Sequence, residues 1–314
     1  MRHMQRRSFF GAVFAGLASA KPPKAKSGGI PTRPLGKTGE KLTIIGEGGA
    51  RFQLVPFEEG KAVVRRAYDL GINYFDMARS YADGHAEEVY GAVIPEFRKD
   101  IFLTTKSLKQ TRQGAEEELN TSLKTLRTDH VDLWQMHLVR NIKEVEQIFA
   151  PGGAMEAFEA AKKAGKCRFI GFTSCKDPQM HVEMLRRSDR FDTALMPLHI
   201  ADPLFSDDPK TSFEKTALPA ACAHGVGALA IKTFANAFLL RTFSVSDCLR
   251  YTLSLPITAT PLGFCTIGQL EDDVRVAQNF KPLTGEEMAV LRARAGTGKD
   301  DATRGPALEY WKTR

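Results

Sequence analysis

Four polar residues stand where strand-like segments of the sequence end, and their types suit proton transfer. Asp76 closes the apolar run GINYFD, and Tyr81 follows it five residues later in a polar, glycine-bearing loop. Lys106 lies near the end of IFLTTKS, and His137 near the end of VDLWQMHL. Each residue alone is ordinary on a surface, at a helix cap or in a loop. At the ends of successive strands, however, the four together indicate a catalytic site.

The chemistry that suits this set is proton transfer coupled to hydride transfer. A free tyrosine has a pKa of about 10 and a free lysine of about 10.4, so neither is poised near neutrality. A carboxylate keeps a buried lysine cationic, and a cation beside a phenol favours the phenolate. We therefore predict that Asp76 holds Lys106 and that Lys106 lowers the pKa of Tyr81, the general acid. We expect His137 to donate a hydrogen bond to a substrate carbonyl.

The segments around these residues alternate between strand-like and helix-like patterns. Strands are expected near 42–45 and at 72–77, 101–107, 131–138, 167–174, 193–199, 227–233 and 258–263. Helices are expected at 58–70, 86–94, 112–127, 153–164, 177–187, 211–224 and 246–254. This alternation and its size predict an α/β fold, a (β/α)8 TIM barrel, whose strands end at one mouth. No G-x-G-x-x-G follows the first strand, which disfavours a doubly wound dinucleotide-binding sheet.

Motifs in these segments resemble those of the aldo-keto reductase family. They are GINYFDMARSY, TTK, WQMH and GFTS, with LGKTGEKLTIIGEGG before them, in the family's order from about residue 33 to 292. The resemblance implies an enzyme that reduces an aldehyde or ketone, or oxidises the corresponding alcohol. The cofactor would be NAD(H) or NADP(H), with no metal. Tyr81 would be the general acid and His137 the orienting group, with Asp76 and Lys106 tuning Tyr81.

The resemblance also assigns positions that would hold the nicotinamide cofactor. They are Gly49, Ala50, Asp76, Thr173, Ser174, Ile231, Lys232, Gly263, Gln269, Asp272 and Asp273. Thr173 and Ser174 replace a Ser-Asn pair that holds the carboxamide, and Leu195 replaces a glutamine. Gly263 and Gln269 lie where NADP-dependent members carry a cation for the 2′-phosphate. This departure favours NAD(H) over NADP(H), while the cofactor's pyrophosphate is expected near the start of the eighth helix.

The first twenty residues resemble a bacterial twin-arginine export signal. Arg6 and Arg7 precede a short Gly/Ala-rich apolar stretch that ends in Ala18-Ser19-Ala20, an A-x-A cleavage site. We expect a signal at 1–20, a flexible linker at 21–30, the barrel at 31–295 and a tail over its mouth at 296–314. The twin-arginine export machinery would be a partner, and the periplasm the destination, with the cytoplasm as the alternative. An exported enzyme would retain its cofactor as a prosthetic group.

The composition argues against several other classes of protein. The formal net charge of +7 includes arginines of the first twenty residues, and no basic block with interleaved aromatics predicts nucleic-acid binding. No apolar run is long enough for stable membrane insertion. Five cysteines without a CxxC pair predict neither disulfides nor a zinc or iron–sulfur site, and we expect buried thiols.

Two other functions remain open at the level of the sequence. The first is a cofactor-binding, non-enzymatic barrel that acts as a redox-responsive partner. The second is a lyase that forms a Schiff base on Lys106. Replacement of Tyr81 by Phe separates the first from a reductase, and borohydride trapping on Lys106 tests the second.

Overall fold

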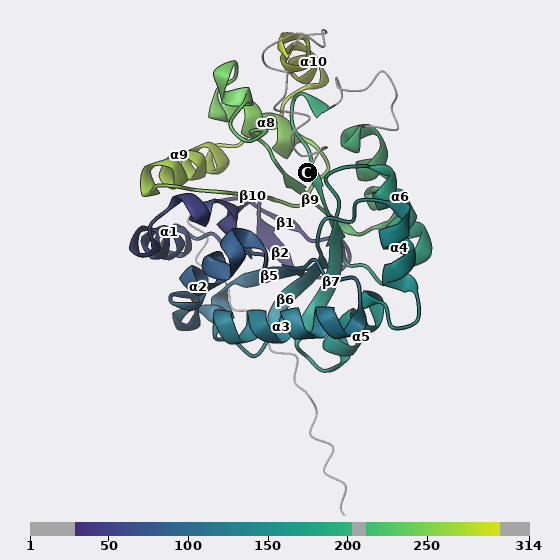
Figure 1. Cartoon of the computed structure of the whole chain (residues 1–314). Helices are drawn as coiled ribbons and strands as arrows, with labels where there is room; N and C mark the ends of the chain where they lie inside the picture. Colours follow the sequence, from purple (N-terminus) through teal and green to yellow (C-terminus); the bar gives the residue numbers. More distant parts are fainter. Residues whose placement is uncertain (1–28, 203–211, 296–314) are drawn as a thin grey trace, which may run out of the picture.

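In the computed structural model, which describes residues 29–202 and 212–295, parallel strands form a barrel (Figure 1). The eight strands are β3 (Ile45–Gly48), β4 (Tyr74–Asp76), β5 (Phe102–Ser107), β6 (Val131–Met136), β7 (Cys167–Thr173), β8 (Thr193–Pro197), β9 (Gly227–Ile231) and β10 (Thr260–Leu262). Their order is β10-β3-β4-β5-β6-β7-β8-β9. A parallel bridge between Leu229 and Ala259 brings the two edges together. The predicted (β/α)8 barrel is confirmed.

Apolar side chains fill the barrel interior and close its amino end. The interior cluster consists of Leu35, Leu42, Tyr74, Phe102, Leu133, Leu195, Leu229 and Ala259. The two leucines that come first in the chain belong to a hairpin of β1 (Thr32–Pro34) and β2 (Lys41–Thr43). The hairpin turn lies against Gly227, the first residue of β9, and therefore at the amino ends of the strands. Because the hairpin closes the amino end of the barrel, a site built from residues at the ends of the strands must lie at the carboxyl end.

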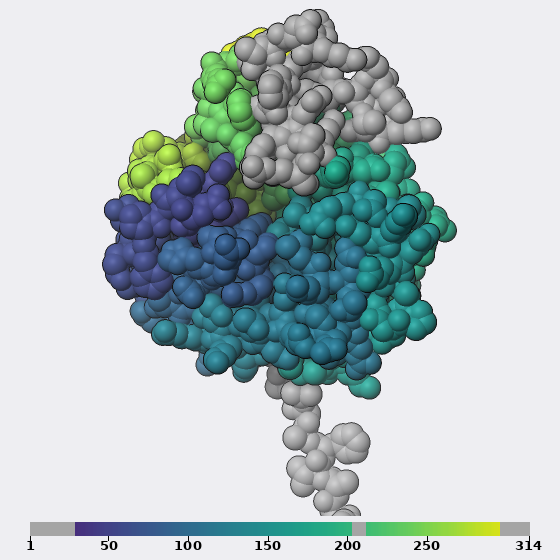
Figure 2. All heavy atoms as spheres, in the orientation of Figure 1, coloured from purple at the N-terminus to yellow at the C-terminus, as the bar shows by residue number. Residues whose placement is uncertain are grey.

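Helices cover the outside of the barrel (Figure 1), and Figure 2 shows the side chains in the same orientation. They are α1 (Phe57–Asp69), α2 (His85–Gly91), α3 (Arg112–Leu126), α4 (Ile142–Phe149), α5 (Ala154–Lys163), α6 (Gln179–Arg187), α7 (Leu218–His224), α8 (Val245–Ser254), α9 (Ile267–Gln278) and α10 (Gly285–Arg294). In α3, Leu119, Leu123 and Leu126 are buried on one face, as their helical spacing predicts. Thr111 caps this helix by accepting a hydrogen bond from the Gly114 N–H.

The core contains Trp134, whose ring stacks on that of Phe158 with centroids 3.7 Å apart. This outward-facing residue of β6 therefore joins a strand to α5. All five cysteines are free, and three of them are buried: Cys167, Cys175 and Cys248. Cys222 is exposed, so the expectation of buried thiols was wrong for that residue.

Several elements differ from the sequence prediction, and α10 was not predicted at all. The first barrel strand is Ile45–Gly48 rather than 42–45, because the earlier apolar residues belong to the hairpin. A short helix, α4, lies between β6 and α5, where only one helix was predicted. A π-helical turn at Phe213–Ala217 precedes α7, where the sequence predicted a continuous helix.

Predictions for the signal at 1–20, for most of the linker and for the tail at 296–314 lie outside the described residues. Within the described ranges, no helix is long and apolar enough to cross a bilayer. The same ranges contain no group of three or more His, Cys, Asp or Glu residues that could hold a metal ion.

Candidate active site

The carboxyl ends of neighbouring strands hold three of the four predicted catalytic residues. Asp76 is the last residue of β4, Lys106 is the last but one of β5, and His137 directly follows β6. Side chains alternate along a strand, and Tyr74 and Phe102 belong to the interior cluster. Asp76 and Lys106, two and four residues further along, therefore point into the barrel mouth as well.

Lys106 contacts both other members of the predicted proton-transfer set. Its Nζ lies 2.6 Å from Asp76 Oδ2, 2.6 Å from the carbonyl oxygen of Met77 and 3.3 Å from the hydroxyl of Tyr81. An ammonium group has three protons, and these three acceptors match them. The Lys106 and Asp76 side chains are almost completely buried, so the ion pair is shielded from water.

The loop that carries Tyr81 is held in an uncommon backbone conformation. Ala82 and Asp83 have φ values of 51° and 54°, and Gly84 follows with a φ of 96°. Arg79 supports this turn through a 2.8 Å ion pair with the buried Glu87 of α2. The φ of Gly84 is one that other residues rarely adopt, so glycine is favoured there. Such strained turns occur most often at functional sites.

His137 lies beside Tyr81 and has a hydrogen-bond partner of its own. The two rings are 5.6 Å apart at an interplanar angle of 78°. Ser80 Oγ is 3.1 Å from His137 Nδ1. The next residue, Leu138, has a φ of 56°, and its N–H donates to Thr173 Oγ1 over 2.8 Å. The loop after β6 is thus fixed by the end of β7.

The predicted effect of Lys106 on the pKa of Tyr81 was wrong. Burial, Asp76 and Cys175 raise the pKa of Tyr81 well above its usual value. Burial likewise lowers the pKa of Lys106, although Asp76 opposes that change. The carboxylate that holds the lysine neutralises it, so the phenol faces an ion pair and not a lone cation. Tyr81 is consequently protonated at neutral pH.

The pKa of His137 is lowered well below its usual value. Burial is the main cause, and the cationic Lys106, Arg140 and Lys232 add to it. The imidazole is therefore neutral at physiological pH, with one ring nitrogen as donor and the other as acceptor.

Sequence comparison assigns this constellation to a known family. A sequence profile of the aldo/keto reductase family matches residues 44–247, which include all four residues of the constellation. The chain belongs to the aldo/keto reductase family.

Named relatives and a solved structure agree with this assignment. The chain is 30% identical over 157 residues to the L-galactose dehydrogenase of Arabidopsis thaliana, covering 46% of this chain and 48% of that protein. It is 32% identical over 164 residues to the aldo-keto reductase yakc [NADP(+)] of Schizosaccharomyces pombe, covering 46% of each. These matches span about half the length of both relatives. The holo form of an aldo-keto reductase from Bacillus halodurans shares the fold, with a TM-score of 0.73, 23% identity, and coverage of 88% of this chain and 100% of that one.

Residues aligned with the family's carboxamide contacts lie at the end of β7 and already have partners within the protein. The hydroxyl of Thr173 accepts from Leu138 N–H, and Ser174 Oγ donates to the carbonyl oxygen of Asp177 over 3.2 Å. Thr173 still has a proton to donate, and Ser174 still has a lone pair to accept with. Both remain suited to an amide ligand.

The other aligned positions lie around the same mouth. Gly49 and Ala50 begin the turn that follows β3. Ile231 ends β9, and Lys232 follows it with a φ of 62°. This ring of strand ends is where a barrel of this family would present a cofactor to a substrate.

Residues assigned to the adenosine side lie in and before α9. Gln269 Oε1 accepts from Cys265 N–H over 2.9 Å, and its side chain thus closes the start of the helix. Asp272 is exposed and forms an ion pair with Arg275. Asp273 is buried, and burial together with Asp272 raises its pKa to about 7. Arg275 is therefore engaged by a carboxylate on the helix surface.

The structure adds a cation to which the resemblance assigned no role, Arg51. Its guanidinium donates to Asn236 Oδ1 over 2.8 Å, which joins the loop after β3 to the loop after β9. Its side chain crosses Gly263, where a Cβ would lie 2.5 Å from Arg51 Cγ. The partner loop is unusual, because Ala235, Asn236 and Ala237 all have positive φ. Only the contact between distant loops shows that Arg51 reaches the end of β10.

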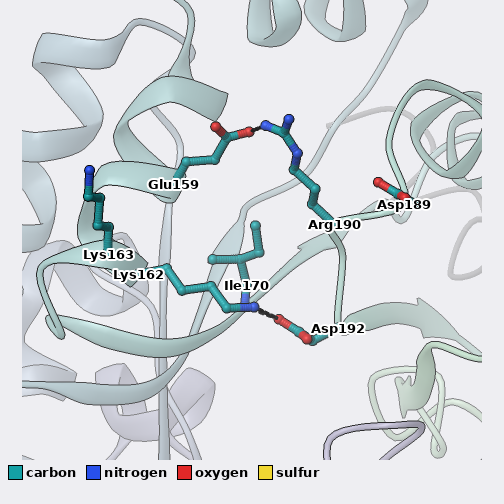
Figure 3. A pocket seen from close by; sticks show the side chains of 7 residues that line it. All are labelled: Glu159, Lys162, Lys163, Ile170, Asp189, Arg190 and Asp192. Carbon is teal, nitrogen blue, oxygen red and sulfur yellow. Dashed lines mark hydrogen bonds and ion pairs between the residues drawn. The ribbon is translucent and has the colours of Figure 1, made fainter.

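A cavity of about 570 Å³ lies away from this site (Figure 3). It is lined by Glu159, Lys162, Lys163, Ile170, Asp189, Arg190 and Asp192. Lys162 pairs with Asp192 over 2.8 Å, and Arg190 pairs with Glu159. Asp192 lies just before β8, so this charged groove is at the amino ends of the strands, away from the catalytic set.

Proposed function

We propose that this family member is a nicotinamide-dependent oxidoreductase that reduces a small aldehyde or ketone, or oxidises the corresponding alcohol. The observation that carries this proposal is the position of Lys106 Nζ, within hydrogen-bond reach of both Asp76 and the Tyr81 hydroxyl. A polar carbonyl compound such as a sugar is the substrate class we favour, since one relative is named a sugar dehydrogenase.

In reduction, the Tyr81 hydroxyl would give its proton to the carbonyl oxygen while the carbonyl carbon accepts a hydride. When bound, the dihydronicotinamide supplies that hydride. The Tyr81 phenolate that remains lies 3.3 Å from the Lys106 ammonium, which stabilises it. We assign the Nδ1 of His137 as acceptor from Ser80, so its Nε2–H donates to the carbonyl oxygen.

The two alternatives differ from this proposal in specific ways. A Schiff-base lyase needs a neutral lysine amine. Here all three ammonium protons of Lys106 have acceptors, which disfavours a nucleophilic lysine. A non-enzymatic barrel would bind the cofactor but transfer no hydride.

The direct experiment is to follow consumption of NADH and of NADPH by the purified protein with a panel of small aldehydes and ketones. The proposal expects catalytic oxidation of at least one of the two cofactors that depends on the carbonyl compound. Cofactor binding without any oxidation across the panel would favour the non-enzymatic barrel.

Ser80 is expected to fix the tautomer of His137. Replacing Ser80 by Ala removes the hydrogen bond to Nδ1 and should lower kcat/KM about tenfold, the cost of one hydrogen bond of about 1.4 kcal/mol. Nitrogen NMR shifts of the ring should show the two tautomers mixing in this variant. Ser80→Thr keeps the hydroxyl and should restore both readings. An unaltered ring spectrum in Ser80→Ala would contradict the assignment.

The residues at the barrel mouth fit a dinucleotide, with Arg51 as its phosphate contact. Gly268 in the first turn of α9 has no atom nearer than 3.9 Å to the position of a Cβ, which leaves its backbone approachable. Among the hydrogen bonds of the described residues, the Arg51 guanidinium, which spans the loops after β3 and β9, donates only to Asn236, so its other N–H groups can donate to a phosphate. We propose NAD(H) or NADP(H), the latter supported by the relative named for NADP(+).

Arg51→Gln should weaken cofactor binding about tenfold or more, because a charge-assisted hydrogen bond is lost. Titration with NADH and with NADPH separates two cases. Equal weakening of both indicates a pyrophosphate contact, and weakening of NADPH alone indicates the 2′-phosphate. Lys61→Gln, on the outer surface of α1, is the matched control and should change neither dissociation constant. Unchanged constants in Arg51→Gln would contradict the assignment.

We propose export to the periplasm by the twin-arginine route, on the N-terminal sequence alone. Replacing Arg6 and Arg7 by Lys should move most of the protein from the periplasmic to the cytoplasmic fraction of a bacterial host. The measurement is immunoblotting of the two fractions, with the unaltered chain as control. An unaltered chain that stays in the cytoplasm would support the cytoplasmic alternative.

A further inference from the structure

Beneath the catalytic pair, the barrel interior contains polar side chains without hydrogen-bond partners. Gln135 of β6 and Thr193 of β8 are fully buried. Among the described residues, nothing is bonded to the amide nitrogen or oxygen of Gln135 or to the hydroxyl of Thr193. Buried polar groups are nearly always paired, either with protein or with ordered water.

These two side chains converge over a glycine. Gly171 of β7 pairs with Gln135 on one side and with Thr193 on the other. A Cβ at Gly171 would lie 2.1 Å from Thr193 Oγ1 and 3.3 Å from Gln135 Cγ. The place that a side chain of β7 would take is thus filled by the Thr193 hydroxyl and bordered by the Gln135 side chain.

The same groups border the catalytic pair. Lys106 is the strand partner of Gln135 on β5. On the other side, the Tyr74 hydroxyl donates to Asp76 Oδ1 over 3.3 Å, and Thr104 lies beside that phenol. Polar groups therefore continue from the catalytic ion pair into the barrel interior, down to the apolar layer at its amino end.

We propose that Gln135 and Thr193 hold an ordered internal water between their polar atoms, and that Gln135 thereby acts as a positioning residue for Lys106 and Asp76. A water can accept from the Gln135 amide N–H and donate to the Thr193 oxygen, which satisfies two of the three atoms that are otherwise unpaired. Its dipole also reduces the cost of burying an ion pair in the barrel. The role in positioning rests on the proposed function, whereas the water site does not.

A double-mutant cycle and a structure test the water site. Gln135→Met and Thr193→Val each leave the other partner unpaired, so each should lower the Tm by about 2 to 4 °C. The double variant should lose less than the sum of the two changes, because no unpaired group remains. A crystal structure at high resolution should show a water within hydrogen-bond distance of both residues. Single variants with a raised Tm, or density with a direct bond between the two side chains, would overturn the proposal.

The positioning role is tested by the pH profile of kcat. Burial already lowers the pKa of Lys106, and loss of the neighbouring polar groups in Gln135→Met should lower it further. The alkaline limb of the profile should then move to lower pH. An unmoved limb in Gln135→Met would overturn the positioning role. If the unaltered protein reduces no carbonyl compound at all, the proposed function fails. The crystal structure and the Tm values of the single and double variants then still test the water site.

Discussion

Replacing Tyr81 by Phe is expected to lower kcat for carbonyl reduction by about 10³-fold, within the usual contribution of a general acid. The variant keeps the ring that packs beside His137 and under Lys106, and it loses only the hydroxyl 3.3 Å from Nζ. Cofactor affinity should therefore stay within about twofold, because only the proton donor is removed. The measurement is kcat with a saturating carbonyl substrate, alongside cofactor titration.

The control for this variant is Tyr68→Phe, which removes a phenol hydrogen-bonded to Asp100 on the outside of the barrel. It should leave kcat unchanged. A Tyr81→Phe protein that keeps most of its activity would refute the role of the hydroxyl and reopen the question of the proton donor.

The pH dependence follows from the same site. Burial and Asp76 raise the pKa of Tyr81, so its proton is present throughout the neutral range. The pKa of Lys106 is lowered by burial, so the lysine is the first of the two to lose a proton as pH rises. Reduction should thus be level near neutrality and decline on the alkaline side. In Lys106→Met, that alkaline decline should be absent from the residual activity.

Glu47→Leu is expected to raise the free energy of unfolding by about 1–3 kcal/mol near neutral pH. Glu47 lies on β3 beside Phe75 and Leu262, is completely buried, and has no partner for either carboxylate oxygen among the described residues. Leucine has a similar size and carries no polar atom. A gain of this size in the free energy of unfolding is uncommon for a single substitution in the core.

The gain should depend on pH. Burial and then Asp76 raise the pKa of Glu47 well above 4.5, so folding takes up a proton at this position. The contribution of Glu47 to the stability of the unaltered protein is greatest below the pKa of this group in the unfolded chain. It falls as the pH rises toward the pKa of the group in the folded protein. The advantage of Glu47→Leu should therefore be larger at pH 8 than at pH 5, as measured by urea unfolding. Glu59→Leu, at an exposed position of α1, should change stability by less than about 0.5 kcal/mol at either pH. A destabilised Glu47→Leu protein would show that the carboxyl has a partner the present contacts do not reveal.

The barrel and its catalytic residues could be predicted because both follow local rules. Strand and helix periods repeat along the chain, and polar groups at strand ends stand out against apolar runs. The first barrel strand was misplaced because Gly46, Glu47 and Gly48 have little strand propensity, whereas Leu42 in the hairpin does. Helix α4 was missed because its eight residues lie in what reads as a loop.

Residues whose roles depend on distant contacts could not be predicted. Arg51 and Asn236 are 185 positions apart, and only the closed barrel brings their loops together. Ser80 lies next to Tyr81, but its bond to His137 depends on the turn that strains Ala82. The direction of the Tyr81 pKa was wrong because burial of the phenol itself, and then the charge of Asp76, raise it.

The most direct test of the account is transfer of deuterium from cofactor to product. The protein would be incubated with NADH or NADPH carrying deuterium at the transferred position of the nicotinamide, together with the panel of aldehydes and ketones, and the alcohols analysed by mass spectrometry. The account predicts one deuterium on the carbinol carbon of at least one product, with the yield lowered about 10³-fold in Tyr81→Phe. Binding of the cofactor with no labelled alcohol from any compound would contradict it.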